Sequence, residues 1–225
     1  MFKSSIAALS LALVGSHALA QSGPDLSFLG QGGMYEVTVT NITPGQTFTP
    51  RLLVTHPASV SLFQPGEPAS MELEQLAEGG DTGPMLDMVV NVAEDAVTMP
   101  GLLEPGQSMT ATIRARGRSR YLSMTAMLLP TNDTFVGVNG LKLPNAGSVT
   151  YMAPAYDAGT EENDQRCANI PGPLCGGQAG SDTAAGDEGF VHISNGFHDL
   201  GGDALTPGAY DWRNPVARVV VRRLR

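Results

Sequence analysis

Residues 121–133 read YLSMTAMLLPTND, and this stretch decides the fold that we expect. The segment Tyr121–Leu129 is an apolar run closed by Pro130, with the length of a buried strand and no helix start or stop signal. A strand of this kind carries the residues after it to one end of the molecule. Asp133, three residues beyond the proline, should therefore lie in a loop at that end.

A second strand and loop follow closely in the sequence. Residues 148–152 (SVTYM) have β-type composition, and residues 157–161 read DAGTE, with Gly159 at the centre where the backbone can turn sharply. The two loops together supply three carboxylates: Asp133, Asp157 and Glu161. Carboxylates gathered on neighbouring loops indicate a site for a hard cation.

The remainder of the chain favours short strands joined by Pro- and Gly-rich connections. Residues 34–40 (MYEVTVT) alternate between two faces, as a half-buried strand requires. Further strands are expected at residues 51–56, 108–114, 189–194 and 216–222, and a loop at residues 201–213. Short helices are expected at residues 68–77, beginning at Pro68, and at residues 84–92. This pattern predicts an all-β fold, an antiparallel β-sandwich with one or two short helices in its connections.

Four arginines alternate around Gly117, at positions 114, 116, 118 and 120. We expect a hairpin tip with the guanidinium groups on one side. This tip is either a solvated face or a local basic patch for an anionic polymer or the headgroups of a membrane, which would be a peripheral contact.

The first twenty residues are typical of a secretory signal peptide. Lys3 supplies the positive start, residues 6–14 an apolar segment too short to span a bilayer, and residues 18–20 (ALA) a small-x-small cleavage site. We expect cleavage between Ala20 and Gln21. No later stretch is long and apolar enough to form a transmembrane helix. The expected location is therefore outside the cell or in the periplasm.

After cleavage the chain would consist of a flexible arm at residues 21–33 and one domain at residues 34–225, which we expect to be a monomer. The formal net charge of −9 disfavours a nucleic-acid partner. The usual hydrolase and nucleotide signals are absent from the sequence, since it has no Gly-x-Ser-x-Gly elbow, His-Glu-x-x-His helix or phosphate-binding glycine loop.

Cys167 and Cys175 are the two cysteines of the chain, and they lie in a segment, residues 165–189, that we expect to be irregular. In an oxidising compartment they should form a disulfide. Because the loop it closes is so short, the disulfide would stabilise the folded protein by roughly 2–3 kcal/mol. A metal site here would need further Cys or His nearby, so the disulfide is the favoured interpretation.

A second group of potential ligands lies near the C-terminus: His192, His198 and Asp199, with Asp187 and Asp203 close in sequence. Histidines beside carboxylates could bind a transition metal or carry out acid–base chemistry. A histidine such as His192 on a strand, on the same face as Phe190, is more often a packed or hydrogen-bonded side chain, and we favour that structural role.

Five strings carry a resemblance to a known family, in the same order along the chain: YEVTVTN (35–41), GEPAS with LAEG (66–70 and 76–79), LSMTAM before PxxD (122–127 and 130–133), DAGTE (157–161) and NPVARVVV (214–221). Together they resemble the spondin N-terminal domain, of the stand-alone microbial kind, over nearly all of the mature chain. The DAGT and PVARV strings are the most specific.

The resemblance implies a β-sandwich similar to C2 domains, with calcium at one apex. The metal carboxylates of the family correspond here to Asp133, Asp157 and Glu161. Glu161 stands where the family has an aspartate, and its extra methylene keeps the charge but changes its reach. The chemistry agrees, because Ca²⁺ takes six to eight oxygen ligands, while Zn²⁺ prefers His or Cys, which neither loop contains.

Two function classes follow. The leading one is an exported, non-enzymatic, calcium-binding module that mediates adhesion or binds an extracellular surface, matrix or partner protein. The alternative is a metal-dependent enzyme with a site around His192 and His198.

Overall fold

Strand β1 (Gly33–Asn41) shows how the sequence pattern becomes structure. Tyr35, Val37 and Val39 are at most 1% exposed, whereas the side chains between them face outward. The predicted alternation is therefore confirmed. The computed structural model describes residues 32–180 and 186–224, so the expected signal peptide and most of the expected N-terminal arm lie outside the described residues.

β1 belongs to a four-stranded antiparallel sheet with the order β5-β1-β11-β8. Its other strands are β5 (Ser108–Ala115), β8 (Ser148–Ala153) and β11 (Ala217–Arg223). All three agree with the strands expected from sequence to within one residue at each end.

The second sheet has seven strands, in the order β10-β9-β7-β6-β3-β4 with β2 paired to β6, and every pairing is antiparallel. Its strands are β2 (Thr47–Phe48), β3 (Arg51–His56), β4 (Asp95–Met99), β6 (Tyr121–Leu129), β7 (Thr134–Lys142), β9 (Ala155–Asp157) and β10 (His192–Ile193). The all-β sandwich expected from sequence is thereby confirmed.

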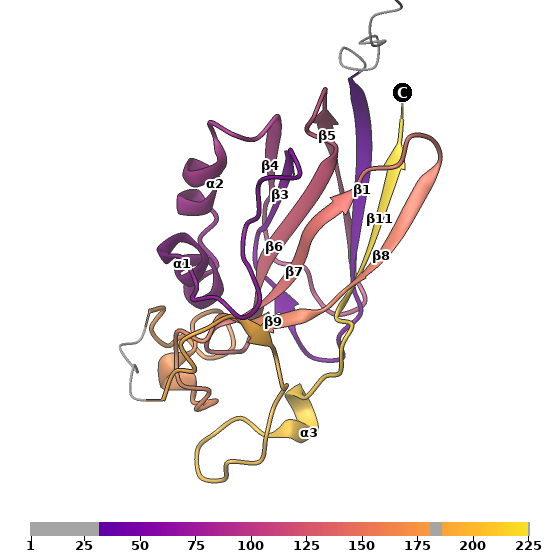
Figure 1. Ribbon diagram of the computed structural model, residues 1–225. Coiled ribbons are helices and arrows are strands. Elements are labelled where there is room, and N and C mark those ends of the chain that lie inside the picture. The colour runs from indigo at the N-terminus through magenta and orange to yellow at the C-terminus, as the bar shows by residue number, and fades with distance from the viewer. Residues whose placement is uncertain (1–31, 181–185, 225) are drawn as a thin grey trace, which may run out of the picture.

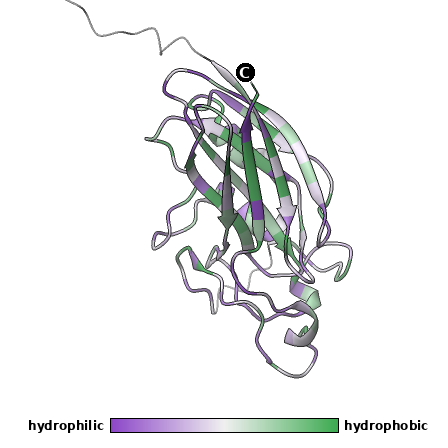
Figure 2. Cartoon of the chain, turned by 90° about the vertical axis from the view of Figure 1, so that its right-hand side faces the viewer, coloured by the Kyte–Doolittle hydropathy of each residue, from purple (hydrophilic) through white to green (hydrophobic). Residues whose placement is uncertain are grey.

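The larger sheet is buried on both faces. One face packs against the smaller sheet, and the other is covered by helices α1 (Met71–Gly79) and α2 (Gly83–Val89), as Figure 1 shows. In β3, Leu53 belongs to the core between the sheets, while Leu52 and Val54 belong to the core under the helices. This double burial explains why residues 121–129 read as a continuous apolar run rather than an alternation. Figure 2 shows the apolar strands of the sandwich.

Both predicted helices exist, with different limits. α1 begins at Met71 and not at Pro68, because the Ser70 side chain accepts a hydrogen bond from the N–H of Leu73 and caps the first turn. It ends where Gly80 takes a left-handed conformation, with φ of 70°, and donates its N–H to the carbonyl of Leu76. α2 begins one residue before the expected start and ends at Val89, short of residue 92.

The arginine-rich segment is not a hairpin, so that prediction was wrong. β5 pairs with β1 in the smaller sheet, whereas β6 pairs with β3 and β7 in the larger one. Residues 116–120 therefore cross from one sheet to the other. An alternating pattern around a glycine fits either connection, because the pairing partners lie far away in sequence.

Two further expectations near the C-terminus need correction. The strand expected at residues 189–194 is reduced to the two residues of β10, and the loop expected at residues 201–213 contains the short helix α3 (Pro207–Tyr210). The rings of Phe190 and His192 do lie on one side of the chain, with centroids 5.4 Å apart.

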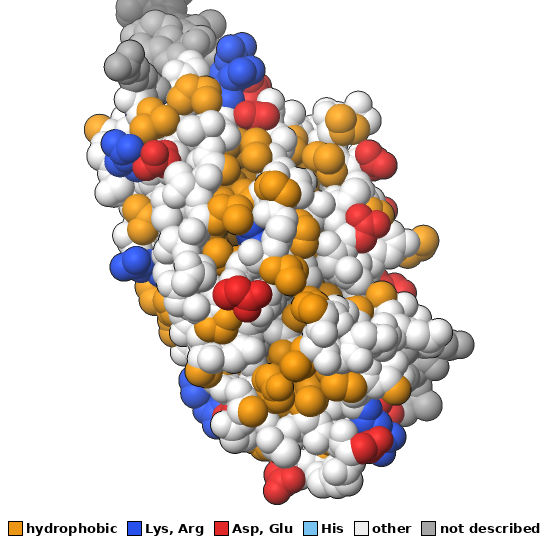
Figure 3. All heavy atoms as spheres, turned by 180° about the vertical axis from the view of Figure 1, so that it is seen from behind, with side chains coloured by type: hydrophobic (Ala, Val, Ile, Leu, Met, Phe, Trp, Pro, Cys, Tyr) orange, Lys and Arg blue, Asp and Glu red, His pale blue; other side chains and the backbone are white. Residues whose placement is uncertain are grey.

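The segment that follows β9 contains the predicted disulfide between Cys167 and Cys175, which is present. A single 3-10 turn, η2 (Cys167–Asn169), interrupts an otherwise irregular course through the described part of this segment. A groove of about 390 Å³ runs beside the disulfide loop, lined mainly by Leu129, three prolines and Leu174. Figure 3 shows apolar side chains gathered towards this end of the molecule. None of the described helices is long and apolar enough to cross a membrane.

Candidate functional site

The two acidic loops meet at one end of the larger sheet. Antiparallel pairing of β7 with β9 places Thr134 opposite Asp157. Asp133, which immediately precedes β7, therefore lies next to the point where β9 ends and the second loop begins. The carbonyl of Asp133 also accepts a hydrogen bond from the N–H of Ala158, at 3.2 Å. The loops that sequence placed near one another are thus in contact.

Asp133 is fully buried, with an exposed fraction of 0%. Its Oδ2 accepts hydrogen bonds from the backbone N–H of Thr160 at 2.8 Å and of Glu161 at 3.1 Å, and a longer one from the Thr160 hydroxyl at 3.3 Å. Its Oδ1 has no hydrogen-bond partner among the described residues. One half of this carboxylate is therefore well bonded, and the other half is buried without compensation.

Burial raises the pKa of Asp133 well above its ordinary value, and the charge of Asp157 raises it further. The two backbone hydrogen bonds at Oδ2 act in the opposite direction, and the charge of Glu161 adds another increase. Without a cation, the folded state therefore disfavours the ionised form of this carboxyl group.

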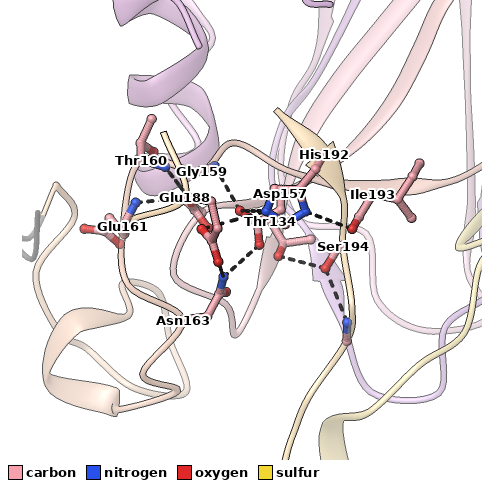
Figure 4. Close-up of polar contacts among 12 residues, drawn as sticks. Thr134, Asp157, Gly159, Thr160, Glu161, Asn163, Glu188, His192, Ile193 and Ser194 are labelled. Atoms are coloured by element: carbon pink, nitrogen blue, oxygen red, sulfur yellow. Dashed lines mark hydrogen bonds and ion pairs between the residues drawn. The ribbon is translucent and has the colours of Figure 1, made fainter. Parts of the chain in front are cut away.

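Asp157 is 2% exposed and is held at both oxygens. Its Oδ1 accepts the N–H of Gly159 at 2.9 Å, and its Oδ2 accepts the side-chain amide of Asn163 at 3.0 Å. Burial raises its pKa, while the Asn163 amide and the neighbouring His192 partly offset that rise. Asp157 is the central acid of the site, because its charge acts on Asp133 and its Oδ1 lies 3.6 Å from Nε2 of His192. Figure 4 shows Asp157 and His192 next to each other.

Glu161 is 1% exposed, and its charge acts on Asp133. Its position depends on Gly159, whose φ is 67° and whose added Cβ would lie 2.4 Å from the carbonyl oxygen of Phe190. Only glycine fits this turn, so the sharp bend expected at Gly159 is present. All three predicted carboxylates, Asp133, Asp157 and Glu161, are thus buried, and the charges of Asp157 and Glu161 both act on Asp133. In the described part of the chain, however, the oxygens of these three do not form a group within 4.8 Å of one another.

Asn132, Asp164 and Gln165 fasten the first loop to the segment beyond the second. The Asn132 side chain donates to Asp164 at 3.0 Å and accepts the N–H of Gln165 at 3.2 Å. Gln165 in turn bonds the backbone of His198, donating to its carbonyl and accepting its N–H, each at 2.7 Å. These side chains hold the loops in place. No feature of the sequence predicts the pairing of Asn132 with Gln165, 33 positions away.

The histidine group expected near the C-terminus is not the one that the fold assembles. His192 lies opposite Asp157 across β10 and β9, with its Nε2 3.6 Å from Asp157 Oδ1 and 3.8 Å from Glu188 Oε2. Ligand atoms of Asp157, Glu188 and His192 all lie within 4.8 Å of one another, and this is the one such group of three in residues 32–180 and 186–224. His198 is outside the group, and Asp203 instead pairs with Arg166 at 3.3 Å.

Glu188 was missed because it lies in an irregular segment, where no periodicity predicts which side chains point inward. Its spacing from His192, four residues, is a signal only on a helix, and this segment is not helical. A cavity of about 110 Å³ opens beside it, with Asp157, Asn163, Glu188 and His198 in its lining.

The fold and the site together define a β-sandwich domain with a cluster of buried acids at one end. The Spondin_N family model matches residues 40–165, more than half of the chain, so the chain belongs to the spondin N-terminal domain family. The match includes Asp133, Asp157 and Glu161 and ends before Glu188 and His192. A comparison with curated proteins gave no match. This is a family of non-enzymatic domains, and membership suggests an extracellular binding module.

Proposed function

We propose that this protein is an exported calcium-binding β-sandwich module that mediates adhesion to an extracellular surface, matrix or partner protein. The observation that carries the proposal is the state of Asp133: its Oδ1 is fully buried, has no hydrogen-bond partner among the described residues, and lies beside two further buried carboxylates. With all three carboxylates ionised, such an arrangement is unfavourable unless a cation neutralises it.

Calcium is the ion that fits the three acids. Asp133, Asp157 and Glu161 offer only oxygen donors, and loop carbonyls and water can complete a shell of six to eight oxygens with flexible geometry. Glu161 in place of the family's aspartate keeps an oxygen ligand. Its longer side chain is compatible with calcium because the coordination geometry of calcium is flexible. The backbone of Thr160 and Glu161 holds Asp133 in place from behind, which leaves Oδ1 for the ion.

A binding role follows from where the ion would sit. The loops at one end of a sandwich carry variable chemistry on a rigid scaffold, and a calcium ion there would fix their shape for a partner. The arginine-rich connection does not border this surface, because it precedes Tyr121, at the opposite end of β6 from Asp133. Any contact of those arginines with a membrane or anionic polymer would be a separate one.

Calcium titration tests the proposal directly. Thermal unfolding of protein stripped with EDTA should shift upward on adding calcium, by about 2.7 kcal/mol at 100 times the dissociation constant, or about 5–10 °C for a chain of this size. Asp157→Asn should remove most of the shift. Asp203→Asn is the matched control, because it removes the same charge at an exposed position 3.3 Å from Arg166. A wild-type melting curve unaffected by both EDTA and millimolar calcium would overturn the proposal.

The adhesion part of the proposal needs its own test. Labelled wild-type protein should be retained on extracellular matrix or cell-surface material in calcium and released by EDTA, and Asp157→Asn should not be retained. Retention that is equal in calcium and in EDTA would separate any adhesive role from the calcium site.

A further inference from the structure

His192 is oriented as a metal-ligating histidine is. Its Nδ1 lies 3.0 Å from the carbonyl oxygen of Ile193. A carbonyl oxygen only accepts, so Nδ1 must carry a proton, and the neutral ring then presents the lone pair of Nε2. A histidine that donates one ring N–H to a backbone carbonyl and turns the other nitrogen to a metal is the common arrangement in metal sites.

Nε2 faces two carboxylates that it does not hydrogen-bond. It is buried and has no hydrogen-bond partner among the described residues. It lies 3.6 Å from Asp157 Oδ1 and 3.8 Å from Glu188 Oε2, distances too long for hydrogen bonds. Ligand atoms about 2.0–2.2 Å from a tetrahedral metal are roughly 3.4 Å apart, so this spacing leaves room for an ion between the three side chains.

The remaining carboxylate oxygens are held away from that space. Asn163 donates its side-chain amide to Asp157 Oδ2 at 3.0 Å and to Glu188 Oε1 at 3.3 Å. Asp157 Oδ1 and Glu188 Oε2 are thereby turned towards His192. One amide that orients two carboxylates is the kind of outer contact that positions metal ligands.

A nitrogen donor with two carboxylates suits a different ion from the calcium site. Imidazole favours zinc and other first-row transition metals, while calcium takes oxygen ligands. The cavity of about 110 Å³ adjoins Asp157 and Glu188 and offers space for water as a further ligand. The charge of Asp157, which the two sites share, also acts on Asp133, whose buried Oδ1 has no hydrogen-bond partner in the described part of the chain.

The geometry points to a second cation site, for a transition metal such as Zn²⁺, formed by Asp157, Glu188 and His192. It goes beyond the proposed calcium site, with which it shares Asp157. Glu188 and His192 lie outside the segment that matches the family model, so the family match does not account for these two ligands. A metal there would tie the segment before β10 to the end of β9.

Zinc binding to EDTA-stripped protein, measured by isothermal titration calorimetry and by elemental analysis after dialysis, tests the inference. The expected result is one zinc per chain in the wild type and at least tenfold weaker binding in both His192→Gln and Glu188→Gln. His198→Ala is the matched control, because that histidine lines the same cavity but is outside the ligand group, and its zinc affinity should not change.

Single substitutions distinguish the calcium site from the transition-metal site. Asp133→Asn should lose the calcium-induced thermal shift and weaken zinc binding less than His192→Gln does, while Glu188→Gln should keep the calcium shift. No zinc binding by the wild type at micromolar concentrations would overturn the inference, because Asp157, Glu188 and His192 would then form no metal site. Zinc binding lost equally in Asp133→Asn and His192→Gln would also overturn it, because zinc would then occupy the calcium site. The Glu188 side chain is 35% exposed, so its substitution tests the site without a core change.

Discussion

The carboxylate of Asp133 accepts a hydrogen bond from the backbone N–H of Glu161 at 3.1 Å, across 28 residues of sequence. The first acidic loop is thus fastened to the main chain of the second, and the link does not depend on a metal ion. The same carboxylate holds its other oxygen buried beside Asp157. Oδ2 of Asp133 therefore fixes the position of the second loop, while the buried Oδ1 favours the binding of a cation.

Asp133→Asn should separate these two roles. The amide oxygen can still accept from Thr160 and Glu161, while the substitution removes a buried charge that repels Asp157. We expect the EDTA-stripped variant to unfold at a higher temperature than the stripped wild type, and the calcium shift to be lost. Differential scanning calorimetry with and without calcium measures both. A stripped variant that melts lower, or that keeps the calcium shift, would contradict this account of the site.

Glu78 gives a prediction about pH. It lies on α1, is 5% exposed, and burial raises its pKa, which a hydrogen bond from Thr160 partly offsets. A carboxyl group whose pKa is raised by folding contributes stability below its ordinary pKa, and this contribution is lost as pH rises through the folded value. Glu78→Gln should therefore stabilise the protein at pH 7.5 and have a much smaller effect at pH 4.

Glu72→Gln is the matched control for Glu78, because Glu72 is exposed on the same helix and has a lowered pKa, caused first by a backbone hydrogen bond and then by Ser70. Its ionised form is favoured by folding, so this substitution should lower stability at pH 7.5. Urea unfolding of both variants at the two pH values measures the sign. Equal effects of the two substitutions at pH 7.5 would show that burial of Glu78 does not govern its ionisation.

Replacement of both Cys167 and Cys175 by serine should leave a folded protein. The bridge closes a short loop whose backbone is also held by bonds from Gly177 to Ile170 and from Gln178 to Ala168. Neither cysteine belongs to the two cores. We expect a loss of roughly 2–3 kcal/mol in urea unfolding, with unchanged calcium binding. Loss of the folded state would mean that this loop supports the sandwich.

Sequence predicted that the loops carrying the three acids would be neighbours, because strand and loop signals lie close to each acid. Pro130 ends a buried run before Asp133, and Gly159 turns the chain between Asp157 and Glu161. It missed β7, whose run TFVGVNGLK is broken by glycines. The structure explains Gly137, since a Cβ there would lie 2.6 Å from the ring of Phe63. A glycine required by tertiary packing thus weakened the local signal for a strand.

Long-range pairing was the part that sequence could not supply. Arg114 and Arg120 flank a connection between different sheets, and the local pattern is the same as for a hairpin. His192 was associated with His198 because both lie in one stretch, whereas β10 pairs it with Asp157, 35 positions earlier in the numbering. Glu188 joins them from a segment without regular structure. These three side chains meet only because of the folded topology.

Gly159→Ala tests whether the turn between the acidic residues is as tightly fitted as its surroundings indicate. The backbone φ is 67°, and an added Cβ would lie 2.4 Å from the carbonyl oxygen and 2.8 Å from the nitrogen of Phe190. Gly147→Ala is the matched control, since its φ is 66° and nothing lies within 4 Å of the added Cβ. Left-handed backbone alone should lower stability by about 1–2 kcal/mol in the control. The collision with Phe190 should make the loss in Gly159→Ala clearly larger, because backbone atoms cannot move aside without displacing β10.

Calcium affinity should also fall in Gly159→Ala and stay unchanged in Gly147→Ala. Calorimetry measures the affinity, and urea unfolding measures the stability. Equal losses of stability in the two variants, with calcium binding intact, would show that the loop carrying Glu161 can shift without disturbing the site.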